Sequence, residues 1–203
     1  MIFLWFIAHR GLVKNGIKEN SIEAFKAAID SNKYCGFELD VRVTKDKVYV
    51  IYHDMLFKGK LVNNVLYKEF KKEHIPKLSD VLKLNTDKII MIEIKDFNID
   101  VIKLSKILNK FNNKNLYISS FNNKILLKLK PYLNNIKIGS LNYILNSLDN
   151  YSSYDFICII NYLITPKIIE YFKANNIELF SYGISNKNNI KYKNIFYIID
   201  ENN

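Results

Sequence analysis

Residues 2–31, IFLWFIAHRGLVKNGIKENSIEAFKAAIDS, decide the fold because they join two kinds of segment. Residues 2–8 form a continuous apolar run, which is typical of a buried strand. Residues 19–31 carry apolar side chains at helical spacing, with Ile22, Phe25 and Ile29 on one face. Asn20 is predicted to cap this helix, since Glu23 follows it three residues later. The stretch therefore predicts the first strand and helix of an α/β fold.

The same alternation of apolar runs and helical patterns continues along the chain. Further strands are predicted at 36–41, 48–53, 89–94, 116–121, 136–141, 156–160, 177–182 and 195–199, and helices at 77–84, 99–111, 123–133, 142–148 and 165–176. This order indicates a parallel sheet. Nine candidate strands suit a TIM-type (β/α)8 barrel, somewhat reduced, with one run extra or wrongly assigned. An open doubly wound sheet is the alternative.

One connection conflicts with an all-parallel sheet. Only RVTKDK, residues 42–47, separates the runs at 36–41 and 48–53. Parallel neighbours need a dozen or more residues for a crossover. The strand assignment is therefore weakest here. A helix near 185–194 is also left open, because that segment is short and polar.

Composition bounds the class of protein. A chain of 203 residues, 49% hydrophobic, can bury one large core, so residues 1–203 are predicted to be a single domain. The net charge of +10 comes from 28 lysines and two arginines, accompanied by 27 asparagines. A+T-rich coding explains this bias, and the lysines are dispersed, so no nucleic-acid partner is expected.

The start of the chain and its cysteines bear on location. The apolar run at 2–8 lacks a preceding basic stretch and a following cleavage site, so it is interpreted as a strand and not as a signal peptide. No run approaches the ~18 apolar residues that span a bilayer. Cys35 and Cys158 show no metal-binding spacing and make no disulfide framework. A cytoplasmic protein with at most peripheral membrane contact is expected, and its oligomeric state stays open.

Polar side chains gather at the carboxyl ends of the predicted strands. Glu38 and Asp40 lie in one such run and Glu93 ends another, and residues i and i+2 of a strand face the same side. In α/β barrels all strand ends meet at one mouth, where active sites lie. Three crowded carboxylates suit one hard divalent cation, Mg²⁺ or Ca²⁺. The alternative is that each carboxylate pairs with a nearby lysine.

Two histidines follow the same rule. His9 and His53 each come directly after an apolar run, and a pair of imidazoles can divide proton removal and proton donation at neutral pH. Structural roles remain the alternative for both. His74 lies in a lysine-rich polar stretch and is predicted to be a surface residue.

Basic residues accompany these groups. Arg10 follows His9 in a chain where arginine is scarce, which indicates a planar two-pronged grip on phosphate. Lys95, two residues after Glu93, is predicted either to touch an anionic substrate or to pair with Glu93. Arg42 is predicted to neutralise the acidic cluster.

Taken in order, the motifs resemble those of a known family. AHRG (8–11), ENSIEAF (19–25), GFELDVRVTKD (36–46), VYVIYHD (48–54), IPKLSDVL (75–82) and IEIKD (92–96) together resemble the glycerophosphodiester phosphodiesterases, which are related to the PI-specific phospholipases C. The resemblance covers residues 7–96 strongly and the later part more weakly. It implies a TIM-type barrel that hydrolyses phosphodiesters.

The resemblance also implies roles for particular residues. His9 and His53 match the family's catalytic histidines, and Arg10 and Lys95 match its phosphate contacts. The family's metal carboxylates match Glu38, Asp40 and Glu93. Tyr182 stands where a substrate-binding tryptophan is expected.

The catalytic residues of the family pattern are all present, and the departures from it lie in the parts that determine which substrate is bound. The family's PENT is KENS here, which loses the proline but keeps Glu19 and Asn20, predicted either to brace Arg10 or only to cap the helix. The DG turn reads DK at Asp46 and Lys47, the stretch between Asp54 and Glu93 is short, and the ending IIDENN matches loosely. The expected activity is metal-dependent hydrolysis of a small-molecule glycerophosphodiester to an alcohol and glycerol 3-phosphate. The alternatives are a lysophospholipase D-like enzyme and a non-catalytic barrel that binds anionic lipid or nucleic acid.

Overall fold

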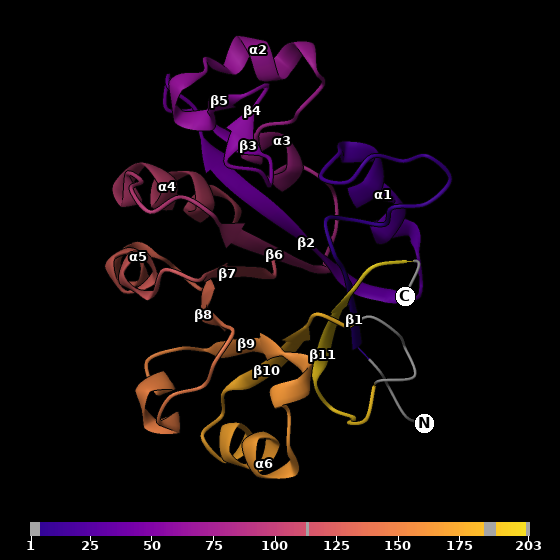
Figure 1. Cartoon of the computed structure of the whole chain (residues 1–203), viewed down its shortest axis with the longest axis vertical. Coiled ribbons are helices and arrows are strands. Elements are labelled where there is room, and N and C mark those ends of the chain that lie inside the picture. Colours follow the sequence, from indigo (N-terminus) through magenta and orange to yellow (C-terminus); the bar gives the residue numbers. More distant parts are fainter. Residues whose placement is uncertain (1–4, 113, 185–189, 202–203) are drawn as a thin grey trace.

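The protein folds into a closed parallel barrel, seen end-on in Figure 1. The computed structural model describes residues 5–112, 114–184 and 190–201. Each barrel strand pairs in parallel with its neighbours, and β1 pairs with both β2 and β11, which closes the ring. The eight strands are β1 (Trp5–Ala8), β2 (Tyr34–Val43), β6 (Ile89–Ile94), β7 (Leu116–Ser120), β8 (Lys137–Asn142), β9 (Phe156–Ile160), β10 (Glu178–Tyr182) and β11 (Phe196–Ile199). The predicted TIM-type barrel is confirmed.

Helices surround the ring on its outside (Figure 1). The longer ones are α1 (Ile22–Asp30), α4 (Val101–Leu108), α5 (Asn123–Leu129) and α6 (Pro166–Ala174). Short 3-10 turns lie at residues 109–111, 130–132, 148–151 and 161–163. Among the described residues, no helix has the length and apolar character to cross a bilayer.

The ninth predicted strand is not part of the barrel. β3 (Tyr49–Ile51) pairs antiparallel with the end of β2, so Val43 lies opposite Tyr49. A hairpin needs only a tight turn, which explains the short connection at 42–47. Lys47, where the family has glycine, takes a left-handed φ of 61° in this turn.

After the hairpin, a small unit packs beside the mouth of the barrel. It contains β4 (Leu56–Phe57), β5 (Lys60–Leu61), a 3-10 turn at 62–64 and α2 (Tyr67–Lys72), whereas α3 (Leu78–Leu82), which follows, packs into the main core. Phe57 and Phe70 stack with ring centroids 4.1 Å apart in its own apolar cluster. This cluster supports the segment that carries His53.

One helix prediction needs correction, and a segment that the sequence left open is described only in part. Residues 142–148 form no helix: Asn142 ends β8, and only the 3-10 turn Leu148–Tyr151 follows. Leu145 and Leu148 pack against the core, but Ile144 is exposed, so the apolar residues do not bury one continuous helical face. In the segment at 185–194, residues 190–194 are irregular and residues 185–189 lie outside the described part.

The cap of α1 also differs from the prediction. Ser21, and not Asn20, is the N-cap, and its hydroxyl accepts a hydrogen bond from the Ala24 backbone N–H at 3.1 Å. Asn20 is thereby left to turn toward the barrel.

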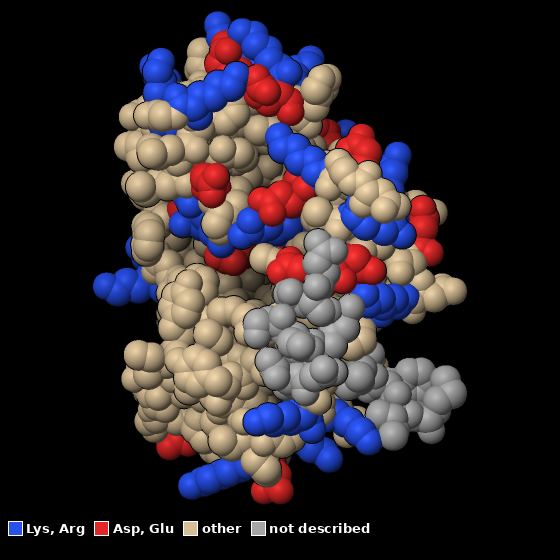
Figure 2. All heavy atoms as spheres, turned by 45° about the vertical axis from the view of Figure 1, so that its right-hand side comes forward, with Lys and Arg blue, Asp and Glu red and all other residues tan. Residues whose placement is uncertain are grey.

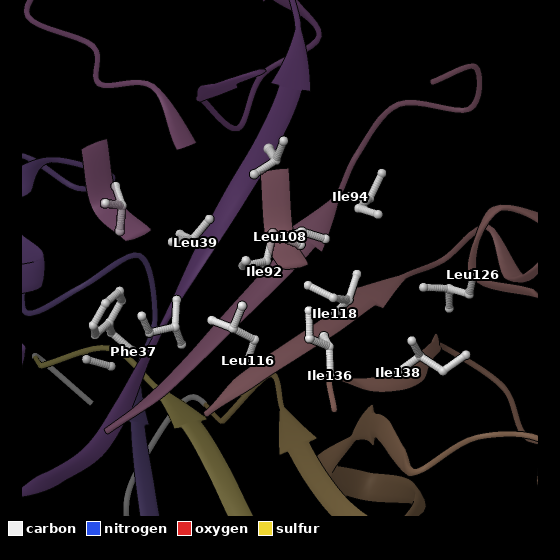
Figure 3. Packing of buried hydrophobic residues seen from close by; sticks show 14 of the residues in the cluster. Phe37, Leu39, Ile92, Ile94, Leu108, Leu116, Ile118, Leu126, Ile136 and Ile138 are labelled. Atoms are coloured by element: carbon white, nitrogen blue, oxygen red, sulfur yellow. The ribbon is translucent and has the colours of Figure 1, made fainter. Parts of the chain in front are cut away.

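Alternation along the strands separates two apolar layers. Phe37 and Leu39 of β2 point outward to the helices, as Figure 3 shows together with Ile92, Ile118 and Ile138 of the neighbouring strands. Inward-facing residues fill the bottom of the barrel, among them Met91, Tyr117, Phe156 and Phe180. The polar residues at the carboxyl ends of the same strands therefore lie above a closed apolar floor.

Candidate active site

Three carboxylates meet at the mouth of the barrel. Glu38 and Asp40 alternate with the outward-facing Phe37 and Leu39 on β2, so both point inward. Glu93 of β6 is in register with Asp40. Ligand atoms of the three carboxylates lie within 4.8 Å of one another. The predicted convergence is confirmed.

Asp40 is the carboxylate with the most partners. Lys95 Nζ lies 3.0 Å from its Oδ1, Arg10 Nε lies 3.2 Å from its Oδ2, and Asn20 Nδ2 donates to Oδ2 at 2.8 Å. Burial alone would raise the pKa of Asp40, but these three neighbours outweigh it and lower the pKa below its usual value. Asp40 is therefore a fixed negative charge in the site.

Glu38 is in the opposite situation. It is buried, and burial together with the nearby Asp40 charge raises the pKa of Glu38 well above its usual value. Arg10 donates its backbone N–H to Glu38 Oε2 at 3.1 Å, whereas Oε1 finds no hydrogen-bond partner in the described chain. A buried oxygen without a partner, beside two more carboxylates, fits a hard cation with oxygen ligands.

Glu93 and Lys95 complete this group. Lys95 Nζ lies 2.7 Å from Glu93 Oε1, so the predicted alternative of pairing between these two residues is realised. Burial raises the pKa of Glu93. Burial would lower the pKa of Lys95, but Asp40 and Glu93 raise it, which keeps the ammonium charged.

His9 is held between two acids. Its Nδ1 lies 2.8 Å from Oδ1 of Asp200, which directly follows β11, and its Nε2 lies 4.0 Å from Glu38 Oε2. Burial by itself would lower the pKa of His9. The hydrogen bond to Asp200 and the Glu38 charge raise it by more than burial lowers it, so the net shift is upward. The imidazole therefore presents Nε2 to the mouth and favours the protonated form.

The backbone after β1 turns sharply to place Arg10. Arg10 and Gly11 both take positive φ, 54° and 83°. A Cβ on Gly11 would lie 2.7 Å from the Cβ of Ala24, so only glycine permits this close approach to α1. Arg10 is held by Glu19 at 2.9 Å in addition to Asp40. The sharp turn and its close contact with α1 thus explain why glycine follows Arg10 in the HRG motif.

His53 follows β3 at the other side of the site. Its Nδ1 lies 2.9 Å from Asp54 Oδ1. His53 also lowers the pKa of Glu93, against the larger effect of burial. Arg42 donates to the His53 carbonyl at 2.8 Å and pairs with Asp96 at 2.7 Å. The prediction that Arg42 neutralises the acidic cluster is wrong: Arg42 braces the His53 segment.

Two hollows adjoin the carboxylates, and Figure 2 shows acidic and basic side chains around the depression on this face. The first is a cavity of about 170 Å³ lined by His9, Glu38, Glu93, Lys95, Met91, Ser119, Phe121, Leu141, Tyr143, Tyr182 and Ile198. The second is a groove of about 480 Å³ between residues 15–23 and residues 51–54 and 73–76, which include His53 and His74. One histidine of the pair thus lines each hollow.

Three aromatic rings line the cavity at the carboxyl ends of β7, β8 and β10. Phe121 and Tyr143 stack with centroids 4.4 Å apart, and Tyr182 meets both edge-on. Tyr182 also donates its hydroxyl to the Asn142 carbonyl at 3.0 Å. The sequence pointed to Tyr182, and the structure adds two aromatic neighbours to it.

Several residues of the site escaped the sequence reasoning. Asp200 was assigned no role, although it too directly follows an apolar run, the signal that found the other groups. Asn20 was expected to cap the helix or, with Glu19, to brace Arg10; Glu19 does hold Arg10, but Asn20 donates to Asp40 Oδ2 and accepts from the Asp40 N–H at 3.3 Å. His74 is exposed, as predicted, and lines the groove.

Comparison with known proteins agrees with this geometry. Residues 9–198, which contain all of the predicted site residues, match the Glycerophosphoryl diester phosphodiesterase family. The chain belongs to this family. A glycerophosphodiester phosphodiesterase of Caldanaerobacter subterraneus subsp. tengcongensis is 30% identical, with 91% of this chain and 87% of that protein covered. The chain is therefore a phosphodiesterase of this family.

Solved structures share the fold of the phosphodiesterase. The glycerophosphodiester phosphodiesterase of Thermotoga maritima has a TM-score of 0.77 and 24% identity, covering 97% of this chain and 94% of its own. A phosphodiesterase of Oleispira antarctica, in complex with the product sn-glycerol-3-phosphate, has a TM-score of 0.75 and 18% identity, covering 95% and 92%.

Proposed function

We propose that the phosphodiesterase hydrolyses glycerophosphodiesters such as glycerophosphocholine and glycerophosphoethanolamine to the alcohol and glycerol 3-phosphate, using a divalent cation and two histidines. The observation that carries this proposal is the cavity that His9, Lys95 and the carboxylates Glu38 and Glu93 line together. The Oleispira relative, which holds sn-glycerol-3-phosphate, supports the same product.

The cation is assigned to Glu38, Asp40 and Glu93. The unpartnered Oε1 of Glu38 and the spacing of the three carboxylates suit Mg²⁺ or Ca²⁺. When bound, the cation supplies positive charge that neutralises a non-bridging phosphate oxygen. Lys95 then serves to balance the carboxylates that remain charged.

The histidines are assigned to proton transfer. His9, with Nδ1 bonded to Asp200 and its pKa raised, favours holding a proton at Nε2 that can pass to the leaving alcohol. His53, oriented by Asp54 and Arg42, is assigned to accept the proton of the attacking hydroxyl or water. Loss of either imidazole removes one of the two transfers.

Two basic residues and the aromatic cluster are assigned to binding. The Arg10 guanidinium is held by Glu19 and Asp40, and Lys95 contacts the other oxygen of Asp40, which supports a role for both cations in binding phosphate. The cavity under Tyr182 and its two aromatic neighbours is of a size for the glycerol part.

The groove is assigned to the alcohol part. Its lining includes the carboxylates Glu19, Glu23, Asp54 and Glu73 together with Tyr52. Carboxylates and an aromatic ring favour a cationic amino alcohol. This preference supports choline and ethanolamine as leaving groups.

The test is release of glycerol 3-phosphate from both substrates with Mg²⁺, with Ca²⁺ and with EDTA. Cation-dependent release is expected, with loss of at least about a hundredfold in His9→Ala. Glu38→Ala is expected to lose cation-dependent activity, whereas Glu69→Gln, a surface carboxylate paired with Lys72, keeps it. Release that persists in EDTA or in His9→Ala contradicts the proposal.

A second candidate substrate is an intact lysophospholipid. The apolar side chains Met91, Leu141 and Ile198 in the cavity, below exposed aromatic rings, favour it. Comparing turnover of micellar lysophospholipid with turnover of soluble glycerophosphocholine separates the two. Family membership and the complete set of site residues weigh against the non-catalytic alternative. The single domain over 1–203 and the cytoplasmic location stay predictions of the sequence.

A further inference from the structure

An arc of exposed apolar side chains borders one side of the mouth. Phe97, Tyr143, Ile144 and Tyr162 are 79%, 60%, 73% and 72% exposed. Each follows the carboxyl end of a strand: Phe97 follows β6, Tyr143 and Ile144 follow β8, and Tyr162 follows β9. Because β6, β7, β8 and β9 are consecutive neighbours in the barrel, and Phe121 follows β7, these side chains lie on an arc of four successive strand ends.

Isolated exposed apolar residues are ordinary, but an arc over four successive loops is not. Contiguous exposed apolar surface marks an interaction site. Phe121 and Tyr143 stack on each other, which holds part of the arc in place. The chemistry of the arc, tyrosine and phenylalanine beside isoleucine, is typical of side chains that enter the interface between water and lipid.

The charge of the adjoining part of the barrel indicates the partner. Between Val101 and Leu148, which includes α4, β7, α5 and β8, the sequence has eight lysines and no aspartate or glutamate. Lys103 and Lys124 lie in the first turns of α4 and α5, at the mouth, and both are exposed. Lys114 and Lys137 lie at the other end of the barrel, where Lys137 pairs with Glu178. Positive charge beside an apolar arc complements a surface of anionic lipid headgroups.

The acids that flank this region are already engaged within the protein. Asp96 pairs with Arg42, Asp100 caps α4 by accepting from the Lys103 N–H at 2.8 Å, and Asp149 accepts from the Tyr171 hydroxyl at 2.6 Å. The charge of Asp96 is thus balanced by Arg42, which lowers its repulsion from an anionic surface, whereas Asp100 and Asp149 keep their charges.

We propose that the arc docks the phosphodiesterase onto an anionic lipid surface, with the mouth of the barrel turned toward the lipid. The apolar side chains enter the headgroup region, and Lys103 and Lys124, at the mouth ends of α4 and α5, supply the electrostatic attraction. This proposal rests on the surface around the mouth and is independent of which phosphodiester is cleaved.

The test is sedimentation of the enzyme with vesicles of phosphatidylglycerol and of phosphatidylcholine. Binding is expected to phosphatidylglycerol, weaker to phosphatidylcholine, and reduced by salt. Ile144→Ser/Tyr162→Ser is expected to lower the partition coefficient at least about tenfold, because two apolar groups no longer enter the lipid. Neither residue lines the cavity or the groove, so turnover of soluble glycerophosphocholine stays unchanged.

A matched control comes from the same basic region. Leu127 of α5 and Tyr132, at the opposite end of the barrel, are each 47% exposed. Leu127→Ser/Tyr132→Ser removes the same kinds of side chain away from the mouth and is expected to leave vesicle binding intact.

Three outcomes overturn the proposal. The first is wild-type protein that does not sediment with phosphatidylglycerol vesicles. The second is equal loss in both double variants, which assigns binding to general surface character. The third is a dimer in sedimentation velocity that only Ile144→Ser/Tyr162→Ser abolishes, without vesicle binding, which assigns the arc to a second copy of the chain.

Discussion

Replacing Asn20 by alanine is expected to lower the stability far more than the same replacement at a helix cap or at an exposed loop residue. Asn20 Nδ2 donates to the ionised Asp40 at 2.8 Å, which contributes about 1.5–3 kcal/mol, and Oδ1 accepts from the Asp40 N–H at 3.3 Å, which contributes about 0.5–1.5 kcal/mol. Asn20 has φ of 53°, where alanine costs roughly 1 kcal/mol more. The sum is a loss of about 4 kcal/mol in the free energy of unfolding.

Thermal unfolding followed by circular dichroism measures this loss. For a chain of this size, each 1 kcal/mol corresponds to about 2–4 °C, so the melting temperature is expected to fall by roughly 8–16 °C. Asn15→Ala is the matched control: Asn15 has φ of 50° but is exposed, so only about 1 kcal/mol of backbone strain is expected. Asn20→Gly has no such backbone strain but still lacks both hydrogen bonds. Equal losses in Asn20→Ala and Asn15→Ala would refute the role assigned to the Asn20 side chain.

Three further variants test the electrostatics and the packing of the site. Asp200→Asn removes the charge that raises the pKa of His9, so the limb of the pH profile of kcat/KM that His9 governs is expected to move to lower pH; an unmoved His9 titration by NMR argues against the pairing. Glu38→Gln is expected to raise the melting temperature of the EDTA-treated protein. The folded-state pKa of Glu38 lies above its unfolded value, so its ionisation destabilises the fold as pH rises between those two values. The same variant is expected to lose the stabilisation that Mg²⁺ or Ca²⁺ gives the wild type, and an equal thermal shift in both proteins contradicts the cation site. Gly139→Ala places a Cβ 2.3 Å from the Phe156 ring and is expected to cost about 1–3 kcal/mol, with smaller loss when Phe156→Leu is added; a purely additive double variant contradicts direct contact.

Local patterns were sufficient for the barrel itself. Strands such as 89–94 and helices such as 165–176 are visible because alternation and helical spacing are properties of a few consecutive residues. The pattern gave a wrong prediction at 142–148, where apolar residues have helical spacing but Ile144 remains exposed. A spacing of side chains predicts a helix only when the tertiary structure offers a face to bury it.

Most of the site could also be predicted, for a physical reason. In a parallel barrel every strand ends at the same mouth, so position at the end of an apolar run brings His9, Glu38 and Glu93 together from separate parts of the chain. The same rule assigned Arg42 to the acidic cluster, but its partner in the structure is Asp96 and not Glu38, Asp40 or Glu93. Position along a strand gives the side of the barrel, but it does not give the partner.

What the sequence by itself determined is therefore the order of strands and helices, and which residues reach the mouth. Only the tertiary structure decided that β3 turns back along β2, that Asn20 holds Asp40, and that Asp200 lies beside His9 across a separation of 191 residues. Those outcomes depend on how the ring closes and which side chains then become neighbours. Closure is a property of the whole chain, because β1 must pair with both β2 and β11 before His9 and Asp200 can meet.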